Sequence, residues 1–220
     1  MMPAADARGL LVDYGGVLTT PVGDSFGAWE RAHGYAPGEV IRLVRDAYDD
    51  ADGGLIGRFE RGEVSSQVFD AELARIFTEA GKHVPDGSLV DAILGRMEPW
   101  GEMWSVVAQA RAAGIPTGLL SNSWGTNMYP RDLLAEHFDV QVISCEVGLR
   151  KPDPEIYHLA SERLGLPPER CAFVDDLDHN VGVARELGMF GVLHDGDTSS
   201  TVTRLQEFLG GALQAGSSRA

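Results

Sequence analysis

Asp13 is the first residue of this sequence with a clear chemical use. It ends the short apolar run Gly9-Leu10-Leu11-Val12 and is followed directly by Tyr14-Gly15-Gly16. A strand that delivers one carboxylate into a glycine-rich turn can present a nucleophile or a metal ligand, because a ligand approaches the backbone closely where no Cβ intervenes. An acid at the end of a strand can also do no more than cap a turn. A chemical role for Asp13 is therefore supported only if other segments bring polar residues to the same edge of the sheet.

Three later segments carry polar residues that could meet Asp13 at one edge of a parallel sheet. They are Leu119-Leu120-Ser121-Asn122-Ser123, Arg150-Lys151-Pro152-Asp153-Pro154 and Phe173-Val174-Asp175-Asp176-Leu177-Asp178-His179-Asn180. Asp175 and Asp176 follow an apolar run, so we expect them to point toward the same edge as Asp13. Adjacent carboxylates repel one another, and a bound divalent cation is the usual remedy. Magnesium fits best, because it prefers hard oxygen ligands and would neutralise a phosphoryl group.

The other two segments offer groups that could hold an anion. Lys151 could bring a point charge to a phosphate and to the nucleophile, whereas Arg150 is expected to be solvated. Ser121 and Asn122 could supply a hydroxyl and backbone donors to phosphate oxygens, although such pairs also end strands without any chemical role. Asn180 could either orient a metal-binding acid or cap the helix that follows.

The elements that must position these residues follow an alternating order. From about Glu98 onward, helical and strand-like stretches alternate, which indicates parallel βαβ units. Strands are predicted at 9–12, 117–121, 140–144, 171–174 and 191–193, and helices at 100–113, at 131–138, from Pro154, at 180–187 and around 202–208. The predicted fold class is therefore α/β, a Rossmann-like parallel sheet flanked by helices.

The stretch between Leu18 and Glu98 is expected to be helical throughout, because its apolar residues recur at helical spacing. An all-helical block directly after the first strand would lie over the carboxyl end of the sheet, where open α/β folds bind ligands, and we predict that it is a lid. Its polar loop 59–63 is expected to be a solvated connector. The predicted domains are a core of 1–18 and 99–211, an insertion of 19–98 and a disordered tail of 212–220.

Composition narrows the class of partner. The formal net charge of −15 works against nucleic acid and against anionic membrane surfaces. No apolar run is long enough to span a bilayer and the first residues lack the features of a signal peptide, so a cytoplasmic protein is expected. Cys145 and Cys171 have no spacing typical of zinc or of a redox pair and are expected to be reduced. The expected partner is a small phosphorylated molecule, and the protein is expected to be a monomer or homodimer.

Taken together, the four segments resemble the haloacid dehalogenase superfamily of hydrolases, and the insertion resembles the cap of its first cap class. Within that superfamily the sequence is most similar to the N-terminal phosphatase-like domain of soluble epoxide hydrolases, and the resemblance covers nearly the whole chain. It implies that Asp13 is a nucleophile that forms an aspartyl phosphate, which splits one difficult displacement into two. It also implies a Mg²⁺ cofactor and a cytoplasmic phosphatase activity.

The resemblance implies a role for each motif residue. Magnesium would be bound by Asp13, by the backbone carbonyl of Gly15, by Asp176 directly and by Asp175 through water, with Asn180 behind these ligands. Phosphate would be bound by four residues, which are Gly16, Ser121, Asn122 and Lys151. Lys151 would also act in catalysis beside Asp13.

Gly15 departs from the family pattern. Most phosphatases of this superfamily have a second aspartate two positions after the nucleophile, which protonates the leaving group and later activates water. Such a general acid and base contributes roughly 100- to 10,000-fold in rate, so we expect weak turnover. His179, Tyr14 or a residue of the insertion could replace it.

Three functions remain open on the sequence alone. The first is a magnesium-dependent phosphatase of low activity that prefers good leaving groups. The second is a relative that binds a phosphorylated metabolite or a partner protein without catalysis. The third is a 2-haloacid dehalogenase, a branch that also lacks the second aspartate, although displacing halide from carbon gains nothing from the Asp175–Asp176 pair.

Overall fold

A five-stranded parallel sheet lies at the centre of the protein. The computed structural model describes residues 7–46, 54–84, 87–125, 128–211 and 213. Within these residues the strands are β1 (Gly9–Val12), β2 (Thr117–Ser121), β3 (Val140–Ile143), β4 (Cys171–Asp175) and β5 (Phe190–Leu193). Their order is β3-β2-β1-β4-β5, so β1 is central and is hydrogen-bonded to β2 and β4. A central strand buried on both faces explains why β1 is a continuous apolar run.

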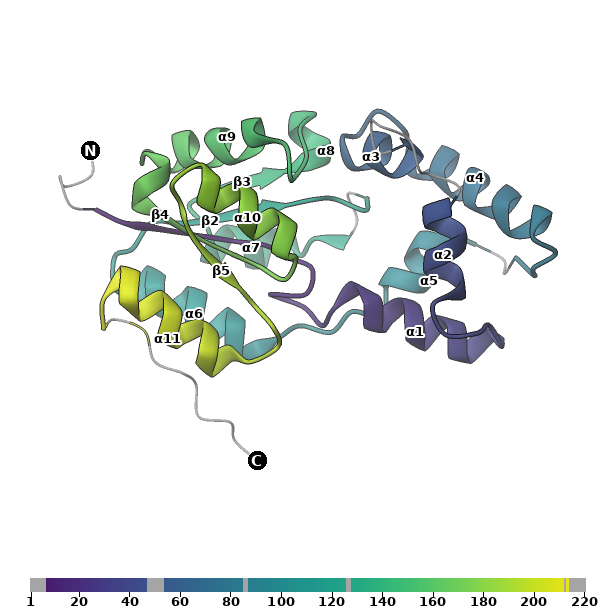
Figure 1. Ribbon diagram of the computed structural model, residues 1–220, viewed down its shortest axis with the longest axis horizontal. Helices are drawn as coiled ribbons and strands as arrows, with labels where there is room; N and C mark the ends of the chain where they lie inside the picture. Colours follow the sequence, from purple (N-terminus) through teal and green to yellow (C-terminus); the bar gives the residue numbers. More distant parts are fainter. Residues whose placement is uncertain (1–6, 47–53, 85–86, 126–127, 212, 214–220) are drawn as a thin grey trace.

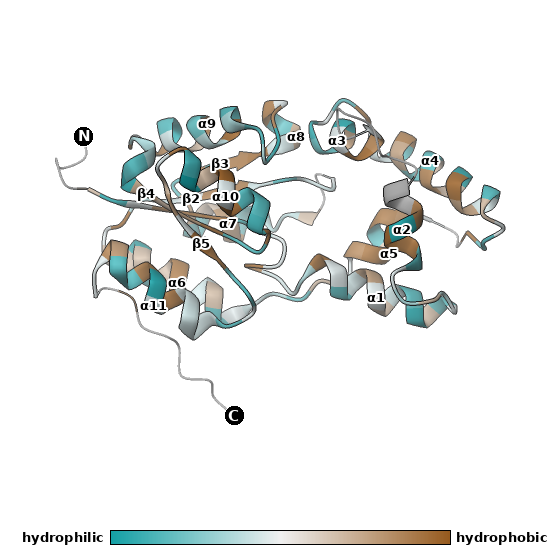
Figure 2. Ribbon diagram, viewed as in Figure 1, coloured by the Kyte–Doolittle hydropathy of each residue, from teal (hydrophilic) through white to brown (hydrophobic). Residues whose placement is uncertain are grey.

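Helices cover both faces of this sheet (Figure 1). One face packs against α6 (Gly101–Ala112), α7 (Arg131–His137) and α11 (Thr198–Leu209), and the other against α9 (Pro154–Leu164) and α10 (Asp178–Glu186). Because successive strand residues point to opposite faces, Leu10 and Val12 join the first core while Leu11 joins the second. Figure 2 shows the apolar strands enclosed between helices whose outer faces are hydrophilic.

The insertion is a separate helical unit beside the carboxyl end of the sheet (Figure 1). Its helices are α1 (Val22–His33), α2 (Glu39–Asp46), α3 (Gly54–Glu60), α4 (Ser66–Glu79) and α5 (Leu89–Leu94). Trp29, Phe69 and Phe77 are fully buried in a hydrophobic cluster of its own, distinct from the two clusters of the sheet. The expectation of a helical segment without strands is confirmed for the described residues of this region.

The two chain crossings between the insertion and the core lie next to each other. Thr19 and Pro99 form an isolated antiparallel bridge, and the Trp100 N–H donates to the Leu18 carbonyl at 2.8 Å. The Thr20 N–H donates to the Glu98 carbonyl at 2.8 Å. The insertion therefore leaves and re-enters the core through one short two-stranded junction.

The observed elements agree with the predicted ones to within a few residues. The sequence did not predict the short helix α8 (Ser144–Val147), which takes the last residue of the predicted strand 140–144, nor the 3-10 turn η2 (Pro168–Arg170). Most of the tail 212–220 lies outside the described residues, but Leu213 is buried and its carbonyl accepts from Gln206 Nε2, so the prediction of disorder is wrong at that residue. Among the described helices, none is both long and apolar enough to cross a membrane.

Candidate active site

Asp13, Asp175 and Asp176 meet at the point where the strand order reverses. Asp13 follows β1, Asp175 is the last residue of the neighbouring strand β4, and Asp176 follows β4. Open α/β sheets bind ligands at such a switch point, beyond the carboxyl ends of the strands. One oxygen of each carboxyl group lies within 4.8 Å of the others. The sequence prediction that these three acids converge is thus consistent with their positions.

Lys151 lies at the centre of this cluster. Its Nζ is 2.8 Å from Asp13 Oδ1 and 2.6 Å from Asp175 Oδ2, and its side chain is 1% exposed. Burial lowers the pKa of Lys151, but Asp13 and Asp175 raise it by more, so that its pKa lies above the usual value and the amine is charged. One buried cation thus faces three carboxylates, and the cluster still carries an excess of negative charge.

Asp175 and Asp176 have different surroundings. The Asp175 carboxylate accepts from Lys151 Nζ, from the Leu177 N–H at 2.8 Å and from Asn180 Nδ2 at 3.1 Å to each oxygen. Asp176 is partly exposed. Of the two alternatives for Asn180, its contacts match the orienting one, because it holds Asp175. Asp178 is exposed at the start of α10.

Burial and the neighbouring negative charges raise the pKa of two of these acids. Burial, followed by the neighbouring charges of Asp175 and Asp176, raises the pKa of Asp13 although Lys151 opposes this. Burial and Asp175 together raise the pKa of Asp176 to about 6. Carboxylates that resist ionisation in this way are stabilised by an added cation.

Two glycines shape the turn after Asp13. Gly16 has a φ of +73°, and a Cβ placed there would lie 2.1 Å from Asp176 Oδ2, so only glycine lets this carboxylate approach the turn. At Gly15 the nearest atom to an added Cβ is Val22 Cγ2 at 3.1 Å. A side chain at Gly15 therefore needs a small shift of Val22.

The segment after β2 is tied to the segment that carries Lys151. Asn122 accepts from the Lys151 N–H at 2.8 Å and donates to the Lys151 carbonyl at 2.9 Å. The Ser121 hydroxyl lies 3.0 Å from the Tyr129 hydroxyl. Because the Asn122 side chain is engaged with Lys151, any phosphate contact from Asn122 must come from its backbone.

Glu60 brings the insertion into contact with this region. Its carboxylate lies 2.7 Å from Arg150 Nε, with only 8% of the Glu60 side chain exposed, and its carbonyl accepts from Ser144 Oγ at 2.5 Å. Burial raises the pKa of Glu60 to about 7, although Arg150 and Lys151 oppose this. The expectations of a solvated connector at 59–63 and of a solvated Arg150 are therefore wrong at these two residues. The sequence offers only a weak signal for this contact: Glu60 and Arg150 have opposite charges and each lies near a glycine. Only the fold brings the two residues together.

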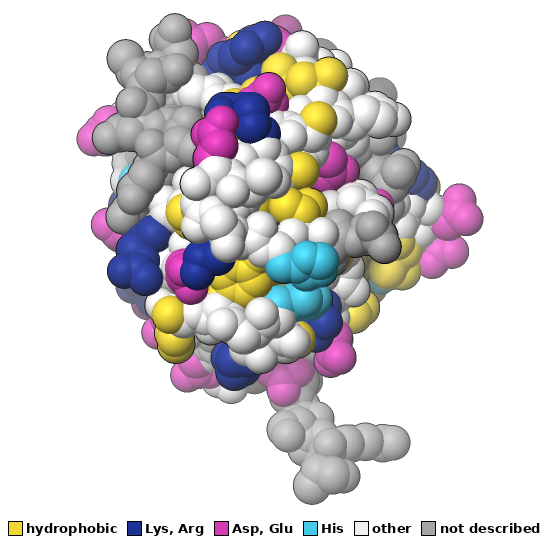
Figure 3. Space-filling model, turned by 90° about the vertical axis from the view of Figure 1, so that its right-hand side faces the viewer, with side chains coloured by type: hydrophobic (Ala, Val, Ile, Leu, Met, Phe, Trp, Pro, Cys, Tyr) yellow, Lys and Arg dark blue, Asp and Glu magenta, His cyan; other side chains and the backbone are white. Residues whose placement is uncertain are grey.

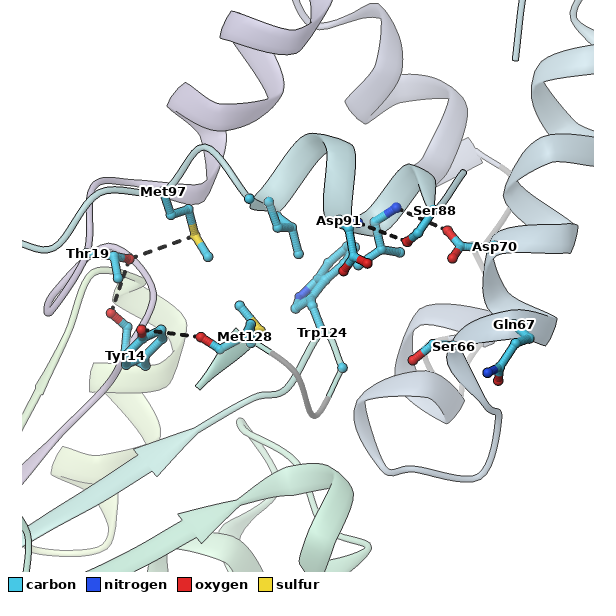
Figure 4. A pocket seen from close by; sticks show the side chains of 14 residues that line it. Tyr14, Thr19, Ser66, Gln67, Asp70, Ser88, Asp91, Met97, Trp124 and Met128 are labelled. Carbon is cyan, nitrogen blue, oxygen red and sulfur yellow. Dashed lines mark hydrogen bonds between the residues drawn. The ribbon is translucent and has the colours of Figure 1, made fainter. Parts of the chain in front are cut away.

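A cavity of about 640 Å³ lies between the insertion and the core (Figure 4). The core contributes Tyr14, next to Asp13 in the chain, and Trp124, three residues after Ser121. The insertion contributes polar and acidic residues of α4 and of the α5 region, which include Ser66, Gln67, Asp70, Ser88 and Asp91. Trp124 both lines the cavity and contacts the Phe26 and Phe69 rings of the insertion edge-on. Neither Asp70 nor Asp91 stands out in the sequence, because acids on an amphipathic helix have no distinctive spacing.

The groups considered as substitutes for a second motif aspartate differ in position. His179 is exposed on α10. Tyr14 is buried, lines the cavity and donates to the Met128 carbonyl at 3.4 Å, and burial raises its pKa. Glu60 is a buried acid of the insertion, and its carboxylate contacts Arg150, the residue before Lys151. None of these contacts places a proton donor at the leaving group.

A parallel sheet with three acids and a lysine at its switch point, beside a helical insertion, is the arrangement of one class of hydrolases with a Rossmann-like fold. The model of haloacid dehalogenase-like hydrolases matches residues 7–188, and the chain belongs to this family. Phosphatases are among its relatives, and the chain is a hydrolase of this family. The predictions of the family and of the fold class are confirmed.

Curated relatives share this likeness over different lengths. The chain is 32% identical over 217 residues to mouse acyl-CoA dehydrogenase family member 10, covering 95% of this chain and 20% of that protein. It is 28% identical over 218 residues to mouse bifunctional epoxide hydrolase 2, covering 90% of this chain and 38% of that protein. A phosphoserine phosphatase of Thermus thermophilus is 38% identical over 100 residues, covering 43% of this chain and 39% of that protein. The chain thus spans well under half of the length of each of these relatives.

Solved structures share the fold. A predicted HAD-like family hydrolase from Porphyromonas gingivalis superposes with a TM-score of 0.67 at 28% identity, covering 91% of this chain and 98% of that one. A HAD family enzyme from Bacteroides thetaiotaomicron in a magnesium complex superposes with a TM-score of 0.65 at 22% identity, covering 90% and 99% of the two chains.

Proposed function

We propose that this hydrolase is a magnesium-dependent phosphatase that removes phosphate from a small phosphorylated metabolite through an aspartyl phosphate at Asp13. One observation carries the proposal: Asp13, Asp175 and Asp176 converge around the buried amine of Lys151. Relatives that are phosphatases support it. The insertion, residues 19–98, would act as the cap over this site.

The donor set fits magnesium. Three carboxylates within 4.8 Å of one another offer hard oxygen ligands, and burial together with the charge of Asp175 raises the pKa of Asp176, which an added cation would oppose. Asp175 is already held by three donor groups, which leaves Asp13, Asp176 and the Gly15 carbonyl as direct ligands and Asp175 as a water-mediated one. Bound Mg²⁺ would neutralise the transferring phosphoryl group. The magnesium complex of the Bacteroides thetaiotaomicron enzyme supports this cofactor.

The residues of this chain would divide the chemistry between them. An Asp13 carboxylate oxygen attacks phosphorus while the bond to the alcohol oxygen breaks, and the alcohol leaves as its anion, which takes a proton from solvent water. Water then attacks phosphorus, the bond to Asp13 breaks, and inorganic phosphate leaves while the proton lost by the attacking water passes to solvent. Lys151, the Ser121 hydroxyl and the backbone N–H groups of Gly16 and Asn122 would hold the phosphate oxygens. Asn180 would orient Asp175.

Gly15 limits the rate in this proposal. With no carboxylic acid at this position, protonation of the leaving alcohol has no dedicated donor, which is equivalent to a loss of roughly 100- to 10,000-fold. Phosphate esters of acidic alcohols, which leave without prior protonation, would be turned over best.

An aryl phosphate assay tests the proposal. With magnesium present we expect release of the phenol, and we expect Asp13→Asn and Asp176→Asn to abolish it. Asp178→Asn is the matched control, because Asp178 is an exposed acid two residues further on. Activity that persists in Asp13→Asn, or without any divalent cation, would refute the proposal.

Gly15 also favours a second candidate, a protein that binds a phosphorylated metabolite without turnover. Magnesium would then raise the thermal stability, and inorganic phosphate would raise it further, while no aryl phosphate is hydrolysed. A haloacid dehalogenase would release halide without metal, and a cluster of three carboxylates offers that reaction no advantage.

A further inference from the structure

The wall of the cavity differs in charge from the rest of the insertion. Of the described residues that line the cavity, two are carboxylic acids, Asp70 and Asp91, and none is a lysine, an arginine or a histidine. Figure 3 shows Lys and Arg side chains on the outer face of the insertion, so basic residues occur on this unit but not on its inner wall. Arg96, the next residue after the lining Gly95, is exposed and does not line the cavity.

The two acids belong to one polar end of the cavity. Asp70 Oδ1 accepts from the Val90 N–H at 3.1 Å, which ties the Asp70 carboxylate to the start of α5. Ser88 Oγ accepts from the Asp91 N–H at 3.0 Å, which holds the backbone of the exposed Asp91 in the first turn of α5. Figure 4 shows Asp70, Ser88 and Asp91 at the end of the cavity away from Tyr14. Between these ends the wall carries Trp124 and other apolar residues, which include Val90, Leu94, Met97 and Met128.

We infer that this cavity selects phosphate monoesters whose alcohol part is uncharged or carries an ammonium group, and that it excludes esters whose alcohol part carries a carboxylate or a second phosphate. This inference rests on the proposed function, because it places the phosphate at Asp13 and the alcohol part in the cavity. The phosphate itself is balanced by Lys151 and the proposed metal. A second anion on the alcohol part meets Asp70 and Asp91 as the charged groups among the described lining residues, on a chain whose net charge is −15.

The charge effect is large enough to measure. A carboxylate held several ångströms from two like charges at a partly solvated wall binds about tenfold or more weakly than a neutral group there. An ammonium group gains a similar factor. Apolar contact alone cannot produce such a preference, because Trp124, Met97 and Met128 would contact the same apolar part of ligands that differ only in a charged group.

Three matched compounds test the inference. They are the phosphate esters of 4-(2-aminoethyl)phenol, 4-ethylphenol and 4-(2-carboxyethyl)phenol, in which two methylene groups insulate the phenol and keep the leaving groups alike. The corresponding benzylphosphonates, which cannot be hydrolysed at this bond, report binding to the magnesium-loaded protein by calorimetry. We expect Kd to rise in the order ammonium, neutral, carboxylate, with about tenfold between neighbours.

Variants identify the source of the order. Asp70→Asn keeps the oxygen that accepts from Val90, and in combination with Asp91→Asn it is expected to bring the three Kd values within about threefold of one another. Glu162→Gln/Glu186→Gln, which removes the same two negative charges at exposed sites on α9 and α10, is expected to leave the order unchanged. An unchanged order in Asp70→Asn/Asp91→Asn, or a carboxylate congener that binds as well as the neutral one, would overturn the inference.

Hydrolysis separates this inference from the proposed function. If the esters are hydrolysed at Asp13 without any charge order, only the charge selection is wrong. If the phosphonates bind in the expected order but no ester is hydrolysed, the phosphatase proposal is wrong and the selection stands. Absence of binding for all three phosphonates would overturn both.

Discussion

Two neighbouring groups of carboxylates differ in whether a basic side chain lies beside them. At the end of β1 and β4 three acids surround one buried lysine, and Asp175 alone has three donor groups. On the wall formed by α4 and α5, Asp70 and Asp91 have no cation among the described lining residues. In the proposed function the first arrangement would bind any phosphate dianion together with a metal, whereas the second would distinguish one alcohol from another. The proposal thus assigns the chemistry to the sheet and the selectivity to the insertion.

Replacement of Lys151 by methionine should remove the difference between the two groups of acids, because the first group would also lack a cation. We expect this change to have the largest effect on activity. The cluster would then hold three carboxylates without a cation, and removing one partner of a buried ion pair costs about 3 to 5 kcal/mol of stability. We expect aryl phosphatase activity to fall by more than about 1,000-fold and unfolding by denaturant to require less urea without magnesium. Added magnesium should restore part of the stability but not the activity. Wild-type activity in Lys151→Met would contradict the role given to this amine.

Gly16→Ala should damage the metal side of the cluster while leaving the wall intact. Its Cβ would collide with Asp176 Oδ2, and its φ of +73° disfavours alanine. We expect the magnesium-dependent rise in Tm to be lost. Gly182→Ala on α10, where an added Cβ meets nothing within 4 Å, is the control and should keep the full rise. An undiminished magnesium response in Gly16→Ala would show that Asp176 is not a ligand.

Gly15→Asp sharpens the comparison by giving the sheet side the acid that it lacks. If protonation of the leaving group limits the rate, turnover of poorly activated alkyl phosphates should rise about 100-fold, at the low end of the range for a general acid. Because an added Cβ lies 3.1 Å from Val22 Cγ2, the double variant Gly15→Asp/Val22→Ala should gain more than the single one. Val22→Ala alone is the control. No gain in either variant would mean that the insertion or the substrate sets the rate.

Glu60→Gln tests the contact between the two regions and should have the smallest effect. The pKa of Glu60 is raised to about 7 from an ordinary value of 4.5, so folding takes up a proton and wild-type stability from this group is lost as pH rises through about 7. Glutamine does not titrate, so the stability of wild type relative to Glu60→Gln should fall by up to about 3 kcal/mol between pH 4.5 and 8. Urea unfolding of both proteins across this range measures the difference.

Glu63→Gln is the matched control for that measurement. Glu63 is exposed, and its ion pairs with Arg61 and Arg58 lower its pKa, so its contribution has the opposite sign and is small. A pH-independent difference between wild type and Glu60→Gln would show that the carboxylate ionises normally in the folded protein.

The sequence predicted the sheet and the acid cluster better than it predicted the contacts of the insertion. The positions of strand-end residues such as Asp13 and Asp175 can be predicted from the sequence, because all strands of a parallel sheet have their carboxyl ends at the same edge. Glu60 and Arg150 were not readable, because their pairing depends on how the insertion sits on the core. Asp70 and Asp91 were missed for the same reason, since facing a cavity rather than solvent leaves no trace in helical spacing. Leu213 shows the same limit at the C-terminus, where small and polar neighbours hide one packed residue.

The paired crossings at Thr19 and Pro99 make the insertion removable in principle. Because the Leu18 carbonyl and the Trp100 N–H are already bonded to each other, a tight turn of two or three residues could replace everything between positions 20 and 98. Such a truncated chain would keep the hydrophobic interior of the sheet, which shares no cluster with Trp29 or Phe69. By the same route a different insertion could replace this one between positions 20 and 98, which would change the cavity wall and leave the acids at the ends of β1 and β4 in place.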